Sequence, residues 1–485
     1  MIRGTSVDDG SRAQEEQTIM TFGYIGRCAF RASGLLLVVA IAASACSGGG
    51  ESSPSPQAES TSSQDASTIA ADAFVWGLPL VVTMRTMQTL GPVIGVNHLY
   101  AQQQLSDASS RTVVAPNVDT LYDVTVLDLR HGPVVLTVPE IRDRYYCFQL
   151  LAMNTESFAY IGTRATGGAA GTWVIAPPGW DGALPAAAQL ISAPTPLVFL
   201  LGRFLVLSAD DLPTARDVMA QVRLEPLTPL TGEPPSAATA LGAAPGTPQN
   251  VADAGAAFFD ELGDVLAISP PASEEDRAEL TRFAALGIGP GLHPAADGSP
   301  DSRAALAKGV ADGAARIRQA LAASTNSVKG WDSHPKLGQY GDDFLLRAAI
   351  AQAGWGANVP EEAVYVTSTQ DANGEDYSGA RGYVMHFAAD QLPPAKAFWS
   401  LTLYAPDMFL FDNPARRYAI GDRTPGLQAN PDGSLDIYLQ QSLPLGHESN
   451  WLPTPEGGFL LEMRIYLPEA TVLDGAYRLP AVKPN

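Results

Sequence analysis

The spacing of apolar and polar residues divides the chain after residue 66 into a helical start, two strand-rich stretches and a helical stretch between them. From Ser67 to about Leu90 apolar residues recur at helical spacing, which predicts an N-terminal helix. Pro79 lies inside this segment. Because proline lacks a backbone N–H, we expect it to kink or break the helix there.

Both strand-rich stretches contain short runs of β-branched and aromatic residues, which are separated by turn residues. This pattern is typical of β-sandwiches. In the first stretch the predicted strands are Arg111–Ala115, Leu121–Leu129, Pro133–Val138, Tyr145–Ala152, Trp173–Ala176 and Leu197–Leu207. In the second they are Ala363–Ser368, Gly382–Phe387, Phe398–Tyr404, Tyr418–Ile420, Leu435–Gln440 and Phe459–Tyr466.

The middle of the chain shows helical periodicity again. Apolar residues at i, i+3 and i+4 spacings predict four helices, at Ala252–Leu266, Glu274–Leu286, Ser302–Ala322 and Asp342–Ala353. Ser273 with Asp276 is a plausible capping pair for the second of them. A segment rich in Pro, Ala and Gly, residues 226–249, predicts a surface loop. The pattern as a whole predicts an α+β, β-rich protein with helices at its start and middle.

The first 46 residues resemble a bacterial lipoprotein signal. Arg27 and Arg31 precede the apolar run Gly34–Ala45, whose 12 residues are too few to span a bilayer. Small residues then lead to Cys46, as in a lipobox, which predicts that Cys46 is lipidated and becomes the N-terminus. The alternative is an ordinary signal peptide cleaved after Ala45. Translation starting at Met20 would remove an acidic, polar segment that is unlike a signal sequence.

Composition narrows the location and the partners of the protein. A Gly/Ser/Pro-rich tether at 47–66 behaves as a coil, so we expect a globular body held at the extracytoplasmic face of the cell membrane by a lipid anchor. The net charge is −21 over 485 residues, and the leader contributes nothing to it. Such an acidic body disfavours nucleic acid as a partner. Cys147 is the single cysteine of the body, and its aromatic surroundings predict a buried, inert thiol.

Two sets of short sequence segments, called phrases below, resemble known families. The phrases that resemble the domain of unknown function 1254 are Pro116–Tyr122, Arg144–Tyr146, Gly162–Arg164, Gly179–Trp180 and Leu201–Arg203. Those that resemble the domain of unknown function 1214 are Tyr340–Arg347, Asn358–Ala363, Phe398–Leu401, Tyr418–Thr424 and Ser449–Pro453. The resemblance implies a helical N-terminal segment and two β-sandwich-like domains, the second jelly-roll-like. It implies no reaction.

With the periodicity, this resemblance gives the expected domain organisation. We expect a signal peptide at 1–46, a disordered tether at 47–66, the first domain at 67–225, a loop and helical connecting block at 226–340, and the second domain at 341–485. No internal repeat is visible.

The usual signatures of catalysis are missing from the sequence. No two of the six histidines lie within four residues of each other, so we expect no metal site of local spacing. Acidic residues at 371–376 resemble a calcium loop, but an ordinary acidic turn is favoured because the sixth-position glycine is missing. There is no G-x-S-x-G, P-loop or dinucleotide fingerprint. We therefore expect no cofactor.

The segment Pro116–Asp123 carries the most chemically active groups. Asn117 and Asp119 lie in a turn between two predicted strands, and such loops commonly carry function. Asp119 is a candidate general base or hydroxyl ligand, with Arg164 as a second catalytic candidate. The alternative is that Asn and Asp close the turn on their own backbone, which we favour for Asp119. Asn117, Tyr122, Tyr146 and Trp180 are candidate ligand-binding residues.

Two later clusters add candidates. Arg416, Arg417 and Arg423 suit carboxylate or phosphate ligands, although pairing with Asp407, Asp412 or Asp422 explains them as well and is favoured. In the second cluster Glu448 is a candidate catalytic group, and Asn450 and Trp451 are candidate sugar-binding groups. A buried tryptophan that anchors a loop is the favoured alternative there.

Two functions fit these observations. The first is a cell-envelope lipoprotein with a surface binding or interaction role, with assembly as a homo-oligomer left open. The second is a metal-independent hydrolase or lyase that acts on a small polar or sugar-like substrate at the cleft between the domains, where ligand sites are frequent. The absence of catalytic motifs favours the first function.

Overall fold

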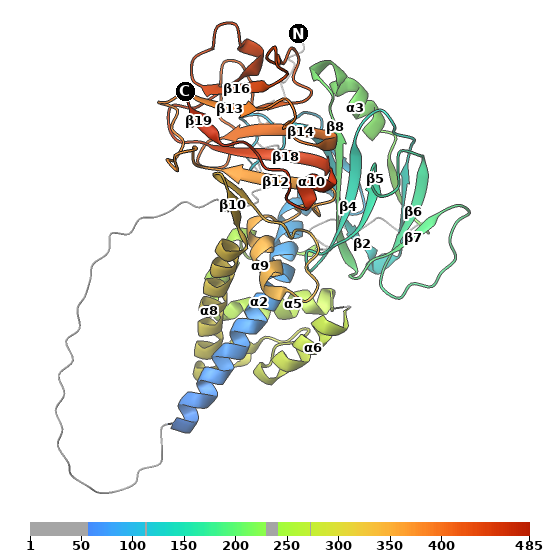
Figure 1. Cartoon of the computed structure of the whole chain (residues 1–485). Coiled ribbons are helices and arrows are strands. Elements are labelled where there is room, and N and C mark those ends of the chain that lie inside the picture. Colours follow the sequence, from blue (N-terminus) through green and yellow to red (C-terminus); the bar gives the residue numbers. More distant parts are fainter. Residues whose placement is uncertain (1–56, 112–113, 229–240, 272) are drawn as a thin grey trace, which may run out of the picture.

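The computed structural model describes residues 57–111, 114–228, 241–271 and 273–485, with the backbone alone for 57–64. The predicted signal sequence, Cys46 and the first half of the tether lie outside the described residues and stay predictions. Residues 57–66, expected to be a coil, instead form the start of a long helix. The described part combines a helical block with two β-rich regions, as Figure 1 shows. The predicted α+β, β-rich class is therefore confirmed.

Helix α2 (Gln57–Ile94) runs through the middle of the helical block. Of the kink or break expected at Pro79, the break does not occur, because one helix contains both Pro79 and Pro92. Side chains all round α2 are buried, and this packing outweighs the backbone hydrogen bond that a proline removes. Residues 65–94 are long and apolar enough to cross a membrane or act as an anchor, but 83% of their most apolar window is buried inside the protein.

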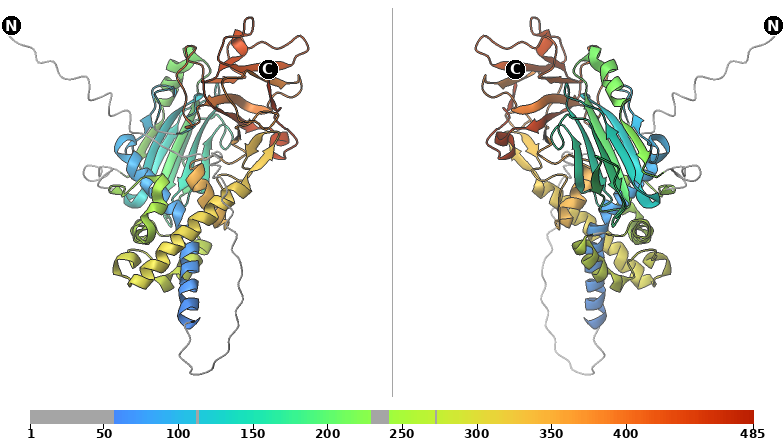
Figure 2. Two further views of the ribbon diagram at one scale, coloured as in Figure 1. Left: turned by 90° about the vertical axis from the view of Figure 1, so that its left-hand side faces the viewer. Right: turned by 90° about the vertical axis from the view of Figure 1, so that its right-hand side faces the viewer.

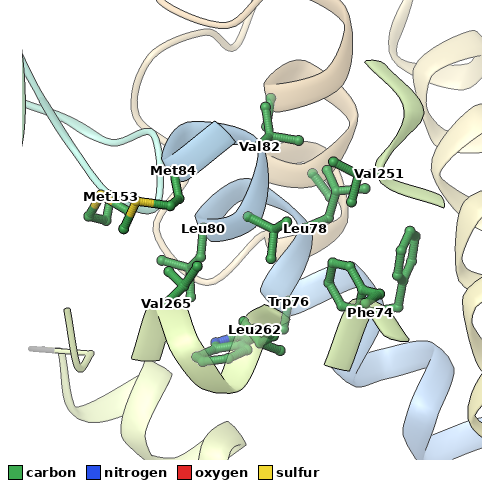
Figure 3. Close-up of a cluster of buried hydrophobic side chains, with 14 of the residues drawn as sticks. Phe74, Trp76, Leu78, Leu80, Val82, Met84, Met153, Val251, Leu262 and Val265 are labelled. Atoms are coloured by element: carbon green, nitrogen blue, oxygen red, sulfur yellow. The ribbon is translucent and has the colours of Figure 1, made fainter. Parts of the chain in front are cut away.

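The other helices of the block pack around α2. They are α5 (Phe258–Ile268), α6 (Glu274–Phe283), α7 (Pro294–Asp297), α8 (Pro300–Ser324) and α9 (Phe344–Ala353), with the 3₁₀ segments η4 (Pro248–Ala257) and η5 (Ala284–Leu286). Figure 3 shows Phe74, Leu78 and Leu80 of α2 among side chains of this core. A Cβ on Gly309 of α8 would lie 2.4 Å from Ala70 Cβ, so the close approach of α8 and α2 requires glycine there. The predicted Ser273 cap is confirmed: Ser273 Oγ accepts from Asp276 N at 3.0 Å.

The first β-rich region is a two-sheet sandwich. One sheet has the order β1-β2-β8-β4-β5 and the other β7-β6-β3-β9. The strands are β1 (Tyr100–Ala101), β2 (Thr120–Asp128), β3 (Val134–Val138), β4 (Tyr146–Ala152), β5 (Ser157–Gly162), β6 (Gly171–Ala176), β7 (Gln189–Ser192), β8 (Leu197–Leu205) and β9 (Arg223–Pro226). Short helical segments accompany them: η2 (Leu129–His131), η3 (Ala209–Asp211) and α3 (Leu212–Met219). Residues 111, 114 and 115 of the predicted strand Arg111–Ala115 are not in a strand.

The second β-rich region also has two sheets, with the orders β10-β11-β12-β18-β14-β15 and β17-β16-β13-β19. Its strands are β10 (Asn326–Val328), β11 (Trp331–Ser333), β12 (Ala363–Ser368), β13 (Tyr383–Phe387), β14 (Ala395–Tyr404), β15 (Ala419–Gly421), β16 (Leu435–Gln440), β17 (Trp451–Pro453), β18 (Leu460–Pro468) and β19 (Val482–Pro484). The helical segments η6 (Glu448–Asn450) and α10 (Ala470–Leu473) complete it. A core of Met, Leu, Ile and aromatic side chains lies between the sheets.

The five-stranded and six-stranded sheets each use both faces. Because side chains alternate along a strand, Leu461, Met463 and Ile465 of β18 enter the second sandwich core, while the residues between them point the other way. In the same way one face of the five-stranded sheet covers the helical block and meets the second domain. Figure 2 shows the first sandwich, the second sandwich and the helices meeting in one region, which we call the junction.

Candidate functional site

The junction contains a cavity of about 590 Å³. This volume lies in the usual range of small-molecule sites, which often form between domains. We call it the junction cavity. Its walls come from β2 and β8 of the first sandwich, from β12 and β18 of the second, and from the end of α9 with the turn that follows it. The polar segment Gln102–Ser110, between β1 and β2, supplies much of the remaining wall.

Arg203 is the principal cation of the cavity wall. It lies in β8, and cross-strand pairing places it beside Tyr122 of β2 and Cys147 of β4. Its Nη1 donates to Gln149 Oε1 at 2.8 Å and to Asn358 Oδ1 at 3.1 Å. Its Nη2 donates to the carbonyl of Gly356 at 3.0 Å. All three acceptors are neutral, so these bonds hold the guanidinium in place without cancelling its charge.

No carboxylate of the described residues lies within 4.0 Å of the Arg203 guanidinium, although this residue is only 5% exposed. An arginine stays protonated in proteins, so it cannot relieve its burial by losing the charge. Burying a charge without a partner is costly. The cavity therefore carries an unmatched positive charge in its wall, a feature that suits an anionic ligand.

Two asparagines orient tyrosine hydroxyls in the same wall. Asn358 uses Oδ1 to accept from Arg203, which leaves its Nδ2 to donate to Tyr365 Oη at 2.8 Å. Asn117 uses Oδ1 to accept from the backbone N–H of Asp119 at 2.7 Å, and its Nδ2 donates to Tyr466 Oη at 2.8 Å. Each tyrosine oxygen is therefore an acceptor of an amide. Neither hydroxyl donates to another group in the described part of the chain.

Arg464 and Glu462 of β18 form a second, matched pair in the wall. Arg464 Nη2 lies 3.1 Å from Glu462 Oε1, and the same guanidinium donates to Thr402, Tyr404 and the carbonyl of Ala115. Glu462 Oε2 is buried and has no hydrogen-bond partner among the described residues. Burial raises the pKa of Glu462, and Arg464 opposes this rise only in part. The pair adds no net charge when both groups are ionised.

The rest of the wall near Arg203 is apolar. Phe199 and Leu201 precede Arg203 on the same face of β8, and the Trp355 ring packs edge-on against Phe199 with centroids 4.8 Å apart. Trp355 Nε1 donates to Thr83 Oγ1 of α2 at 2.9 Å, which fixes the indole in the wall. Gly356 has a φ of +78°, a left-handed conformation that glycine adopts at no steric cost. This turn lets one short segment present both the indole and the carbonyl that binds Arg203.

Of the residues proposed from the sequence, Asn117 and Tyr122 line the junction cavity. Asp119 does not line it. Its Oδ1 accepts from Arg423 at 2.6 Å and its Oδ2 from Ser400 Oγ at 2.5 Å, so it joins the two sandwiches. The turn itself is closed by Asn117. Arg164 pairs with the buried Glu362 at 2.5 Å and is also outside the cavity wall.

The remaining sequence candidates lie elsewhere. Tyr146 belongs to the first sandwich core and Trp180 to a turn after β6. Arg416 is exposed, and Arg417 donates to the carbonyls of Glu448 and Trp451. Two of these arginines have carboxylate partners, which are mostly not the expected ones. Arg423 pairs mainly with Asp119 and lies 3.7 Å from Asp422, and Arg416 lies 3.8 Å from Asp107.

In the cluster around Trp451, each side chain supports the local fold. Asn450 is buried and bonds the backbone of Gln428 and Asp436. The Trp451 indole donates to the carbonyl of Gln440 at 2.7 Å, and Glu448 is exposed. This arrangement is the anchored loop that the sequence favoured.

No group of three or more His, Cys, Asp and Glu side chains suited to a metal occurs in the ranges that the structure describes. In the acidic segment 371–376, Asp371 Oδ1 accepts from the backbone N–H groups of Asn373 and Glu375. This is the geometry of a turn.

Five residues that matter most in the wall were not among the sequence candidates: Arg203, Tyr365, Glu462, Arg464 and Tyr466. A signal for three of them was available. Arg203 follows five apolar residues and one glycine in β8, and Glu462 and Arg464 interrupt an equally apolar β18. Charged residues are seldom buried without a specific reason, so charges inside such runs mark special positions.

Two protein family models match the chain, and both describe proteins of unknown function. DUF1254 matches residues 96–226 and DUF1214 matches residues 362–470. No curated protein matches the chain. The solved structure of the VPA0106 protein from Vibrio parahaemolyticus is similar over 87% of this chain and 100% of its own, with a TM-score of 0.66 and 23% identity. The structure of an uncharacterized protein from Burkholderia cenocepacia matches 88% of this chain and 95% of its own, with a TM-score of 0.40 and 14% identity.

Proposed function

From the premise that this chain pairs a DUF1254 domain with a DUF1214 domain, two domains of unknown function that here enclose one cavity, we propose that it is a binding protein for a small organic anion. The ligand occupies the junction cavity. It is held by groups from both domains, which explains why the two domains occur as one unit.

The unmatched charge of Arg203 is the observation that carries this proposal. A buried guanidinium with three neutral hydrogen-bond partners and no carboxylate is poorly stabilised in the empty protein. An anion in the cavity supplies the missing charge, and guanidinium groups bind carboxylate and phosphate oxygens through paired hydrogen bonds. The acidic body, at −21, makes such a positive site exceptional on this molecule.

Native mass spectrometry tests this function without knowledge of the ligand. The protein is purified from its own cells, and bound small molecules are released by denaturation and identified. We expect a stoichiometric organic anion with the wild-type protein and its loss with Arg203→Gln, which keeps one donor but removes the charge. Arg303→Gln is the matched control, because Arg303 is an exposed residue of α8 outside the cavity. Equal ligand content in all three proteins would contradict the proposal.

The cell envelope is the proposed location. The lipobox-like sequence before Cys46 and the polar tether after it support a lipid-anchored, extracytoplasmic protein. Mass spectrometry of the mature N-terminus is expected to find a lipidated Cys46. Recovery of Cys46→Ala in the membrane fraction, to the same extent as the wild type, would refute the anchor.

An enzyme at the same cavity is the second candidate function, and Glu462 is the observation that favours it. This carboxyl lines the cavity with one oxygen unpartnered, and its raised pKa suits proton transfer. If the protein is an enzyme, Glu462→Gln retains the bound ligand and no longer converts it. If the protein only binds, the ligand released from wild type is identical to the ligand taken up.

A further inference from the structure

We propose that the ligand of the junction cavity is a monocarboxylate with an apolar body, such as a medium-chain or aryl-substituted carboxylic acid. This inference rests on the proposed function and goes further by naming the ligand class. Its carboxylate accepts hydrogen bonds from Arg203, Tyr365 and Tyr466, and its body lies along Phe199, Leu201 and Trp355.

The tyrosine hydroxyls are set as donors toward the ligand. A phenol has one proton to donate, and its oxygen accepts. Asn358 and Asn117 occupy an acceptor position on Tyr365 and Tyr466, respectively, and each asparagine is held in that orientation by a bond to its own carbonyl oxygen. Burial raises the pKa of both phenols, so both keep their protons at neutral pH. The hydroxyl protons are thus available to an acceptor in the cavity.

The charge of the wall selects a monoanion. Arg203 supplies one unmatched positive charge, while Arg464 is offset by Glu462 at 3.1 Å. A second negative charge on the ligand would enter a buried region that holds Glu462 and has no further unmatched cation among the lining residues described. Desolvating that second charge is unfavourable. A carboxylate therefore fits the wall better than a phosphate dianion does.

The surroundings of Arg203 select the rest of the ligand. Phe199 and Leu201 share the strand face with Arg203, and Trp355 stands against Phe199 with its only indole N–H used by Thr83. A ligand body that lies here meets carbon on these sides. A sugar-like body would leave hydroxyls without partners against them, at the cost of unmade hydrogen bonds.

Isothermal calorimetry with three probes of equal chain length tests the head group. Octanoate, 1-octanol and octyl phosphate are titrated into the purified protein at pH 8, where octyl phosphate is mostly a dianion. A second pair, 4-phenylbutanoate and 4-phenylbutan-1-ol, covers a bulkier body. We expect binding of at least one carboxylate, with its alcohol and the phosphate at least about 10-fold weaker.

Tyrosine variants test the predicted contacts. Tyr365→Phe and Tyr466→Phe each remove one donor to a charged group and are expected to weaken carboxylate binding about 5- to 30-fold. Alcohol binding should change much less. Tyr377→Phe is the matched control, because Tyr377 is a buried tyrosine in the second sandwich core, bonded to Ser368. Its affinity should equal that of the wild type.

The outcomes distinguish the assignment of a monocarboxylate from the more general function of anion binding. If the phosphate binds as tightly as the carboxylate, or if both tyrosine variants bind like the control while Arg203→Gln does not bind, the carboxylate assignment is overturned and the anion-binding function stands. If no probe anion binds and the native protein carries no anion that depends on Arg203, both are overturned. Thermal unfolding of each variant, compared with wild type, identifies any that fail to fold.

Discussion

Arg423 and Arg203 both reach into the junction between the two sandwiches, but they meet different surroundings. Arg423 Nη2 contacts the carboxylate of Asp119 at 2.6 Å, and its Nη1 donates to the carbonyl of Val206 at 2.7 Å. Arg203 is bonded only to neutral oxygens. The first arginine joins two domains through a matched charge, while the second presents an unmatched charge to a cavity.

The difference separates two kinds of charged residue at one interface. A charge with an opposite partner stabilises the fold, while a charge without one is available to a ligand. Glu362, which holds both Arg164 and Tyr145, belongs with the matched group. Asp123 adds a third case, since it is buried and its Oδ1 has no partner in the described chain. A carboxyl in that position can take up a proton, whereas an arginine cannot lose one. An unmatched Arg203 therefore needs an outside anion, and an unmatched Asp123 does not.

The largest loss of stability is expected from breaking the ion pair between Asp119 and Arg423. Asp119→Ala leaves Arg423 and Ser400 without their acceptor at the domain junction, and removing one partner of a buried pair costs about 3–4 kcal/mol of unfolding free energy. Denaturant unfolding measures this loss. Asp119→Asn should cost less because its amide oxygen still accepts one bond. Loss of ligand binding at unchanged stability would instead make Asp119 a functional residue.

The next effect concerns Asp123 and depends on pH. Burial raises the pKa of Asp123 from 3.8 to about 7. The folded protein therefore holds a proton between these values that the unfolded chain has released, and stability falls as pH rises through this window, by at most about 1.4 kcal/mol per pH unit. The stabilisation is complete below pH 4 and lost above pH 7.

Asp123→Asn removes this titration. We expect its unfolding free energy to be flatter than that of wild type between pH 4 and 7, with a difference on the order of 3 kcal/mol accumulated across the window. Urea unfolding at four pH values measures both curves. Parallel curves would show that Asp123 has a charged partner in solution and does not belong in the unmatched group.

A smaller effect is expected for the stability of Arg203→Gln. The substitution leaves some carbonyl partners of Arg203 with fewer donors, which is destabilising, but it also removes a buried charge, which is stabilising. The two terms oppose each other, so we expect a change within about 1 kcal/mol in the ligand-free protein. A loss as large as that of Asp119→Ala would place Arg203 with the matched, structural charges.

The sequence predicted the periodic parts of the fold and few of the contacts. Strands with a regular alternation, such as Ala363–Ser368 and Leu435–Gln440, were predicted with their observed bounds. The two-residue strand β1 and the short edge strand β7 carry no pattern long enough to detect. The helix continues through Pro79, where a break was one expected outcome, because local propensity does not include the burial that surrounds α2.

The candidate site was harder to predict, because it is assembled from segments far apart in the chain, such as Asn117 and Tyr466, which are 349 residues apart. Asp119 and Arg164 were proposed as neighbours of one cleft, but each found its own partner, Arg423 and Glu362, in the second domain. Asn117 and Tyr122, proposed as ligand-binding residues, line the junction cavity, since the turn before β2 reaches the junction. Which charge finds a partner depends on domain packing, and a single sequence does not contain that information in local form.

The last prediction changes no stability and concerns the reactivity of Cys147. It tests whether the charge of Arg203 differs from that of Arg423 in having no partner inside the protein. Cys147 lies across from Arg203 on the neighbouring strand, where a thiolate would neutralise Arg203 from inside the protein. Burial raises the pKa of this thiol to about 12. The thiol is therefore neutral, and the charge of Arg203 stays unmatched.

In a variant with serine at residues 28 and 46, Cys147 is the single thiol. Because the ordinary pKa is 9.0, its reaction with a disulfide reagent at pH 8 should be at least about 1000-fold slower in the native state than in denaturant. Rapid reaction in the native state would reveal a thiolate beside Arg203, and Arg203 would then need no external anion.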